Sequence, residues 1–251
     1  MIASLMMYAR PELDAALTTY WHFIRARLAA EGIEAPETLA QGAAEFDVWE
    51  DPALVLSQTC GMPYRTKLHR SVQLVGTPDY SLDGLLPGYY RSAIVVPADD
   101  PRVDIEAYAT ARLAFNMADS QSGFAAIYAH TKAAGFWFTD RVQSGGHVNS
   151  ARMVAHGTAD IASIDAQTWR LIQRYEPWPT QLRVLEYTTP TPGLPYITGP
   201  QHDANTVFGA VSGAIADLSA EDRSMLDLNG LVAIPQSAYI AVQNPPVEAL
   251  L

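Results

Sequence analysis

The feature that most constrains the fold is an alternation of short apolar strand patterns with helix patterns along most of the chain. Strand patterns lie at 2–8, 54–58, 72–75, 93–96, 112–116, 141–144, 159–164 and 183–187, and helix patterns at 11–31, 123–134, 148–156 and 167–175. Alternation of this kind favours helices packed on a mainly parallel sheet. We therefore expect an α/β protein.

Two proline-rich stretches, Val95–Pro101 and Thr188–Pro195, interrupt this alternation and enclose a block of α/β pattern. Proline-rich segments suit domain boundaries and semi-rigid connections. They predict two α/β lobes joined by a two-segment hinge, near 93–98 and 187–195. Residues 1–92 with 189–251 would form the discontinuous lobe 1, and 93–188 lobe 2. A cleft between such lobes is a natural ligand site.

The charge and the single cysteine exclude several classes of function. A formal net charge of −11 argues against binding to nucleic acid, which needs clustered Lys and Arg. It does not exclude a small anion, because a few backbone N–H groups and hydroxyls suffice to bind one. Cys60 alone cannot form an internal disulfide or a cysteine-based zinc cage. We expect no catalytic residue, no metal and no cofactor.

The N-terminal segment and the distribution of apolar residues along the chain indicate where in the cell the protein is expected. Residues 1–7 are apolar but lack the basic start and the cleavage site of a secretory signal. No run approaches the ~20 apolar residues that span a membrane. The expected location is periplasmic or extracytoplasmic if a signal has been removed, and cytoplasmic otherwise.

Two polar loops each precede a predicted helix. Ser120 and Ser122 lie at the first helix start, beside N–H donors that have no intrahelical partner and near the positive end of the helix dipole. His147 follows Gly145-Gly146 at the second and can donate a hydrogen bond to an oxyanion. The simpler interpretations are helix capping for the serines and a structural role for the histidine. If both helix starts face one cleft, they predict an anion site.

Other candidates are individually weaker. Asp165 ends a strand, where it could accept a hydrogen bond from a ligand or orient His147; its alternative role is to cap the next helix. Tyr8 or Tyr64 could supply an aromatic wall or a hydroxyl donor, although Tyr8 fits a core position as well. Cys60 could be a nucleophile near a helix start, but a buried inert cysteine is the simpler interpretation.

Taken in order, these stretches resemble the solute-binding proteins of phosphonate and phosphite ABC importers. The matching motifs are a Ser-x-Ser-Gly at 120–123, a Gly-His at 146–147 and a strand ending in a polar residue at 165, with Tyr-x-Ser at 90–92 and Pro-Gly-x-Pro at 192–195. The resemblance covers residues 54–197 and is weaker at both ends.

This resemblance implies a type 2 periplasmic-binding-protein fold, in which two lobes close on a ligand like a hinged clamp. By the same match, Ser120, Gln121 and Ser122 would hold a phosphonate, phosphite or related anion. Tyr90 and His147 would add donors from opposite sides, and Asp165 would lie near the other end of the ligand. The chain departs from the common pattern at Gln121, where relatives often have a smaller hydroxyl residue. The implied partners are the small anionic ligand and a membrane subunit of an ABC transporter.

Two further functional hypotheses stay open at this stage. A two-lobed scaffold can also host an enzyme, here with Cys60, His147 and Asp165 as nucleophile, base and orienting group. The absence of a recognisable signal motivates the other, a ligand-sensing subunit in the cytoplasm.

Overall fold

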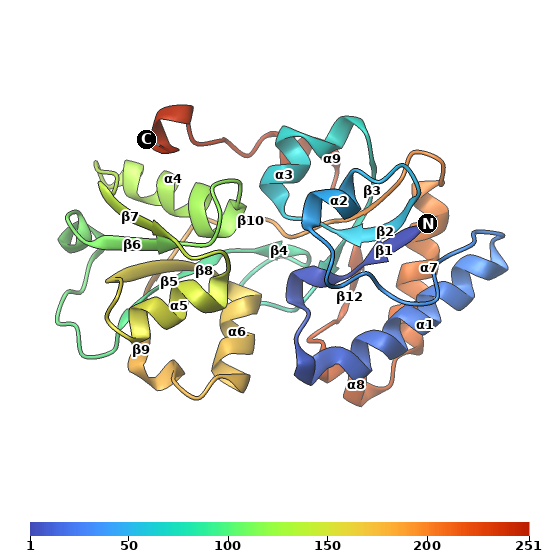
Figure 1. Ribbon diagram of the computed structural model, residues 1–251, viewed down its shortest axis with the longest axis horizontal. Coiled ribbons are helices and arrows are strands. Elements are labelled where there is room, and N and C mark those ends of the chain that lie inside the picture. Colours follow the sequence, from blue (N-terminus) through green and yellow to red (C-terminus); the bar gives the residue numbers. More distant parts are fainter. Residues whose placement is uncertain (251) are drawn as a thin grey trace. The chain divides into compact units, whose positions relative to one another are not determined.

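The computed structural model describes residues 1–250 and divides the chain into two compact α/β units (Figure 1). The first unit comprises Met1–Tyr89 and Pro192–Ala241, and the second comprises Tyr90–Thr191 with the described part of the segment that begins at Val242. The chain therefore passes from one unit to the other at three places, after Tyr89, after Thr191 and after Ala241.

The first unit is built on a five-stranded sheet of order β1-β2-β11-β3-β12. Its strands are β1 (Ile2–Ser4), β2 (Leu54–Gln58), β3 (Gln73–Asp79), β11 (Tyr196–Thr198) and β12 (Gly230–Val232). Its helices are α1 (Asp14–Ala30), α2 (Glu45–Trp49), α3 (Gly61–Thr66), α7 (Ala204–Asp217), α8 (Ala220–Met225) and α9 (Gln236–Ile240), with 3-10 turns at Met6–Tyr8, Pro11–Leu13 and Leu68–Arg70. The expected strand over 2–8 is thus only three residues long, because the chain turns into a 3-10 helix at Met6.

The second unit is built on a sheet of order β7-β6-β8-β5-β9. Its strands are β5 (Ser92–Pro97), β6 (Arg112–Phe115), β7 (Asp140–Gln143), β8 (Ile161–Asp165) and β9 (Leu182–Tyr187). Its helices are a π turn (Gln121–Ala125) that continues into α4 (Ala126–Ala133), then α5 (His147–Ala155) and α6 (Ala166–Tyr175), with 3-10 turns at Ile105–Tyr108, Pro179–Gln181 and Val247–Leu250.

Both faces of this second sheet are covered, which explains the continuous apolar run of the interior strand β5. Ala93 and Val95 of β5 pack in a cluster that includes side chains of α5 and α6. Ile94 and Val96 pack in a second cluster, which includes Ile127 of α4. Successive residues of a strand point to opposite faces, so a strand buried on both faces has no polar alternation.

The sheets are mixed, and the expectation of a mainly parallel sheet was wrong. β1 pairs with β2, and β6 with β7 and β8, in parallel, but β5 runs antiparallel to β8 and β9, and β11 antiparallel to β2 and β3. β12 is also antiparallel to β3. β5 and β11 are each the first strand of a five-stranded sheet after a passage between units. They are not reached by a helical crossover within one sheet, the connection that makes neighbouring strands parallel.

The connections between units are short and hydrogen-bonded. β4 (Tyr89–Tyr90) and β10 (Thr191–Pro192) pair in a two-stranded sheet. Within the first unit, the N–H of Gly193 donates to the carbonyl of Gly88 at 2.8 Å. Within the second, the N–H of Ser92 donates to Thr188 Oγ1 at 2.9 Å, and the N–H of Thr188 donates to the Ser92 carbonyl at 3.0 Å.

This arrangement corrects the hinge expected near 93–98 and the assignment of the whole of 189–251 to lobe 1. Residues 92–97 form β5, whose residues 92–96 are buried in the second sheet. The segment from Val242 belongs to the second unit, where the indole N–H of Trp137 donates to the Ala249 carbonyl at 3.1 Å. Proline content indicated a boundary region, but it did not separate a strand end from a hinge.

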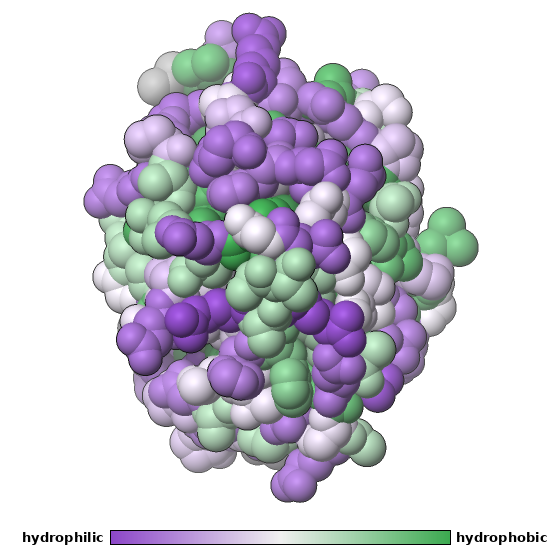
Figure 2. Space-filling model, turned by 90° about the vertical axis from the view of Figure 1, so that its right-hand side faces the viewer, coloured by the Kyte–Doolittle hydropathy of each residue, from purple (hydrophilic) through white to green (hydrophobic). Residues whose placement is uncertain are grey.

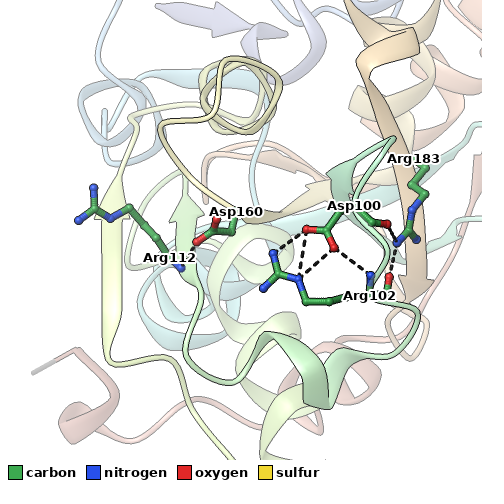
Figure 3. Close-up of polar contacts among 5 residues, drawn as sticks. All are labelled: Asp100, Arg102, Arg112, Asp160 and Arg183. Atoms are coloured by element: carbon green, nitrogen blue, oxygen red, sulfur yellow. Dashed lines mark hydrogen bonds and ion pairs between the residues drawn. The ribbon is translucent and has the colours of Figure 1, made fainter.

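The loop that follows β5 is held in place by charged side chains (Figure 3). The guanidinium of Arg102 donates to both carboxylate oxygens of Asp100, at 2.6 to 3.1 Å, and lowers the pKa of that carboxyl to about 2. Arg183 on β9 donates from Nη2 to the carbonyl of Asp100 at 3.0 Å and also to the carbonyl of Arg102. The end of the proline-rich stretch Val95–Pro101 is therefore part of an ordered connection within one unit.

No helix among the described residues is both long and apolar enough to cross a membrane. On the face drawn in Figure 2, hydrophilic and hydrophobic side chains are interspersed. The largest apolar exposures in the described chain belong to separate residues, such as Leu86, Val103 and Val247.

Replacement of Arg183 by Met should loosen the loop at 98–104. Two hydrogen bonds from a partly buried guanidinium are lost, so we expect the free energy of unfolding to fall by about 1–2 kcal/mol in urea titrations followed by circular dichroism. Arg112→Met is the matched control, because its ion pair with Asp140 is half exposed and should change stability by less than about 0.5 kcal/mol. Equal losses in the two variants would contradict the role given to Arg183.

Candidate functional site

The candidate site begins at the carboxyl end of β6, where the chain turns into the helix that contains α4. Ser120 is the N-cap of this helix, and its Oγ accepts a hydrogen bond from the N–H of Gly123 at 3.0 Å. The N–H groups of Ala125 and Ala126 donate five residues back, to the carbonyls of Ser120 and Gln121. The first turn is therefore a π turn, a rare conformation that occurs frequently at functional sites.

The second part of the site is the loop after β7, the strand parallel to β6. The N–H of Ser144 donates to the Phe115 carbonyl at 2.8 Å, and the N–H of Gly145 donates to the Asn116 carbonyl at 3.0 Å. α5 then begins at His147, with Gly146 as an N-cap that provides no side-chain acceptor. Ligand sites in α/β sheets lie at the carboxyl ends of strands, and both loops are at that edge.

The structure brings the two helix starts together within the second unit. Ser122 Oγ lies 2.8 Å from Nε2 of His147, and Nδ2 of Asn116 lies 3.5 Å from the same nitrogen. Asn116 is 7% exposed, and its Oδ1 is buried without a hydrogen-bond partner among the described residues. A buried acceptor without a partner is uncommon in folded proteins, so this oxygen is available to a donor that enters the site.

Gly123 is what allows this close approach. A Cβ on Gly123 would overlap Oδ1 of Asn116 and would lie 2.8 Å from its Cγ and 3.2 Å from Cε1 of His147. Only glycine at this position lets the π turn lie directly against both side chains.

The site is electrically neutral. Burial lowers the pKa of His147 to about 4, an effect that the main chain of Ser163 partly offsets. At pH 7 the imidazole is therefore uncharged, like Asn116, Ser120 and Ser122 around it. Attraction for an anion here comes from hydroxyl, amide, imidazole and first-turn backbone N–H groups rather than from a cationic side chain.

The sequence-predicted residues of the second unit have different outcomes. Ser120, Gln121 and Ser122 are all buried, and Ser120 caps its helix as the simpler interpretation proposed. Asp165 Oδ1 accepts from the N–H groups of Gln167 and Thr168 at 2.8 and 2.9 Å, so it also caps a helix. Tyr90 is 4% exposed in β4. Contact of these residues with a ligand stays a prediction.

The candidates in the first unit are less favourable. Tyr64 is 1% exposed in the apolar core, where its ring packs edge-on against Tyr239 with centroids 5.2 Å apart, and burial raises its pKa to about 12. Tyr64 thus occupies a core position, and its contact with a ligand stays a prediction. Tyr8 is partly buried in the Met6–Tyr8 turn and packs edge-on against Tyr80 at 5.1 Å. Cys60 is buried at the N-cap of α3.

Two polar residues that the sequence interpretation missed belong to this site, Asn116 and Ser163. Asn116 directly follows β6, and Ser163 is a fully buried serine in the middle of β8. A serine inside an otherwise apolar strand buried on both faces was the available signal, because such a hydroxyl needs a nearby acceptor. Among the described residues, no group of three or more His, Cys, Asp or Glu side chains is arranged to hold a metal ion.

The family model described as "ABC transporter, phosphonate, periplasmic substrate-binding protein" matches residues 56–239, which is most of the chain. No curated protein sequence matches the chain.

Several solved structures have the same fold. PhnD1 from Prochlorococcus marinus (MIT 9301), in complex with methylphosphonate, is 13% identical with a TM-score of 0.70, over 95% of this chain and 93% of that one. XAC2383 from Xanthomonas citri, bound to ATP, is 14% identical with a TM-score of 0.69, over 94% and 91%. A binding protein component of an ABC phosphonate transporter from Pseudomonas aeruginosa is 14% identical with a TM-score of 0.67, over 95% and 82%. These similarities confirm the expected two-lobed fold of the type 2 periplasmic binding proteins.

Gly123→Ala should disrupt the site by overpacking. We expect the free energy of unfolding to fall by about 1–3 kcal/mol, since the added methyl group must displace Asn116. Gly209→Ala in α7 is the control: no atom lies within 4 Å of the added Cβ, and alanine in a helix interior should stabilise by up to about 1 kcal/mol. Thermal unfolding of both variants measures the difference, and two stabilised variants would refute the close packing at Gly123.

His147 should make stability depend on pH. Its pKa is near 6.5 in the unfolded chain and about 4 in the folded protein, so the unfolded chain takes up the proton first as the pH falls. The contribution of His147, up to about 3 kcal/mol, should therefore be fully present above pH 6.5 and lost progressively towards pH 4.

Urea unfolding of the wild type and of His147→Gln at pH 7 and pH 4 tests this. The variant should lose less stability between the two pH values than the wild type, and His22→Gln, which changes an exposed histidine, should behave like the wild type. If His147→Gln retains the full pH dependence, the imidazole is not the buried neutral group described above.

Proposed function

We propose, because the chain belongs to the family of periplasmic substrate-binding proteins of phosphonate ABC transporters, that it captures a phosphonate, phosphite or related small oxyanion for uptake. The proposal includes an extracytoplasmic location and delivery of the ligand to a membrane subunit of an ABC transporter. It assigns the chain a binding role without catalysis.

The observation that carries this proposal is the meeting of two helix starts at Ser122 and His147. Hydroxyl, imidazole and first-turn N–H groups converge there, and such groups hold a tetrahedral oxyanion through many short hydrogen bonds. The buried Oδ1 of Asn116 adds an acceptor. It suits an anion that retains one acidic proton, such as the monoanion of a phosphonate.

The net charge of −11 makes these local donors necessary. A globally acidic protein repels anions at long range, although this repulsion is screened within about 10 Å at 0.1 M salt. Binding must then come from groups in direct contact with the ligand. In a partly buried site, where the local dielectric constant is low, such neutral dipoles are worth more than in water.

The choice of a phosphorus oxyanion depends on the family rather than on the solved structures. PhnD1 is bound to methylphosphonate and XAC2383 to ATP, so proteins of this fold hold ligands of different size. The enzyme alternative with Cys60, His147 and Asp165 is less favoured. Oδ1 of Asp165 already accepts two backbone hydrogen bonds as the cap of α6, so it is not free to orient an imidazole. The cytoplasmic sensor alternative differs in location and partner but predicts the same ligand site.

Titration calorimetry with methylphosphonate, phosphite, sulfate and ATP tests the function. We expect at least one of the phosphorus oxyanions to bind with a micromolar or lower Kd. Ser122→Ala should weaken that binding by about ten- to a hundredfold, since a hydrogen bond to a charged group contributes about 1.5–3 kcal/mol.

Thr131→Val is the matched control, since Thr131 is a buried hydroxyl later in the same helix whose Oγ1 donates to the Ile127 carbonyl. Its affinity should equal that of the wild type. Absence of heat and of thermal stabilisation with all four ligands at millimolar concentration would contradict the proposed function.

A further inference from the structure

The carbonyl oxygen of Ser122 has an unusual environment for a helix carbonyl. It accepts a hydrogen bond from Oγ of Ser92 at 3.0 Å and another from Oγ of Ser163 at 2.6 Å. Ser92 comes from β5 and Ser163 from β8, neighbouring strands of the second sheet. Both serines are at most 1% exposed, so neither hydroxyl has bulk water as an alternative partner.

This pair of hydroxyls coincides with the point where the helix departs from α geometry. A carbonyl oxygen has two lone pairs, and two O–H donors can satisfy both of them. In an α-helix that carbonyl would instead accept the N–H four residues later. At this turn the N–H groups of Ala125 and Ala126 donate to carbonyls five residues back. The N–H of Ala126 therefore bonds to the carbonyl of Gln121 and not to that of Ser122, its partner in an α-helix.

The same turn sets where the binding groups of Ser122 point. Its Oγ contacts His147, and the next residue, Gly123, lies against Asn116. A rotation of the peptide that follows Ser122 would move both contacts at once. The two buried hydroxyls are the side-chain groups that fix this peptide.

Ser92 also connects this turn to the passages between the units. It lies two residues after Tyr90, where the second unit begins, and it exchanges hydrogen bonds with Thr188, shortly before the second passage. Ser92 therefore bonds on one side to Thr188, which directly follows β9, and on the other to the Ser122 carbonyl.

We propose that Ser92 and Ser163 are positioning residues: they hold the Ser122 carbonyl in the π turn and thereby aim the hydroxyl and first-turn N–H groups of that turn at the bound anion. This assignment of roles to two residues rests on the proposed function for its ligand. The hydrogen-bond arrangement itself does not depend on any ligand, which allows the two to be tested separately.

The experiment compares Ser92→Ala, Ser163→Ala, the double variant and Thr131→Val. Calorimetry with methylphosphonate and phosphite measures affinity. We expect each single variant to bind about three- to tenfold more weakly and the double variant at least tenfold more weakly, because the loss of one neutral hydrogen bond typically changes an equilibrium by that factor. Thr131→Val should bind like the wild type at a comparable loss of thermal stability.

A second measurement, by NMR spectroscopy in the absence of ligand, reports on the hydrogen bonding of the Ser122 carbonyl. Labelling serine carbonyls with ¹³C and glycine nitrogens with ¹⁵N gives a carbonyl–nitrogen correlation only for Ser-Gly pairs, which occur at 122–123, 144–145 and 212–213. Ser122→Ala identifies the first signal by its disappearance. A carbonyl that loses hydrogen bonds moves to lower ¹³C frequency, so this signal should shift in both serine variants and stay in place in Thr131→Val.

The outcomes separate the two proposals. If the wild type binds none of the ligands but the 122–123 signal shifts as expected, the arrangement stands and the ligand assignment fails. If the wild type binds and the folded double variant keeps its affinity within twofold, the positioning role is overturned. It is equally overturned if the 122–123 signal does not move in either serine variant.

Discussion

The short contact between Ser122 Oγ and Nε2 of His147 is the interaction on which the site depends. It joins the helix after β6 to the helix after β7, so it links two loops that leave the same edge of the sheet through parallel neighbours. Because glycine at position 123 leaves no side chain between them, Asn116 enters the same cluster. A neutral imidazole is essential here, since a cationic one would have to be desolvated against hydroxyls and amides that carry no compensating charge.

The path of the chain explains why the sheet that supports this contact is mixed. β6, β7 and β8 are joined by helices and run parallel, whereas β5 runs antiparallel to both β8 and β9. β5 carries the chain into the unit, and β9 is the last strand of this sheet before the chain leaves it. β5 lies between β8 and β9 in the sheet. Ser92, the first residue of β5, is therefore close to a passage between units and also bonds to the carbonyl of Ser122 in the site.

The sequence allowed the main elements and the two helix starts to be predicted, because their signals are local. A serine before a helix and a Gly-Gly-His before another can be recognised from a few adjacent residues. What brought Ser122 to His147 was the pairing of β6 with β7, and the order of strands is not a local property. Asn116 and Ser163 were missed for that reason: each has a role only through residues at least seven positions away in sequence.

The errors have a similar origin. Proline at 97 and 101 predicts a hinge, although Val95 and Val96 lie within β5 and the following loop is fixed by Arg183 on β9. The strand before Tyr64 predicts a cleft position for this residue, whereas the burial of its ring beside Tyr239 comes from tertiary packing. In each case the sequence indicated a change of element, and only tertiary packing decided its direction.

The chain passes between its units an odd number of times, so the segment that starts at Met1 and the one that starts at Val242 belong to different units. Fluorescent proteins fused to the two ends would thus be carried on opposite units, without an insertion into either sheet. A donor–acceptor pair placed in this way would make energy transfer sensitive to any relative motion of the units. The division of the chain between the units thus suits the construction of an optical reporter of ligand binding.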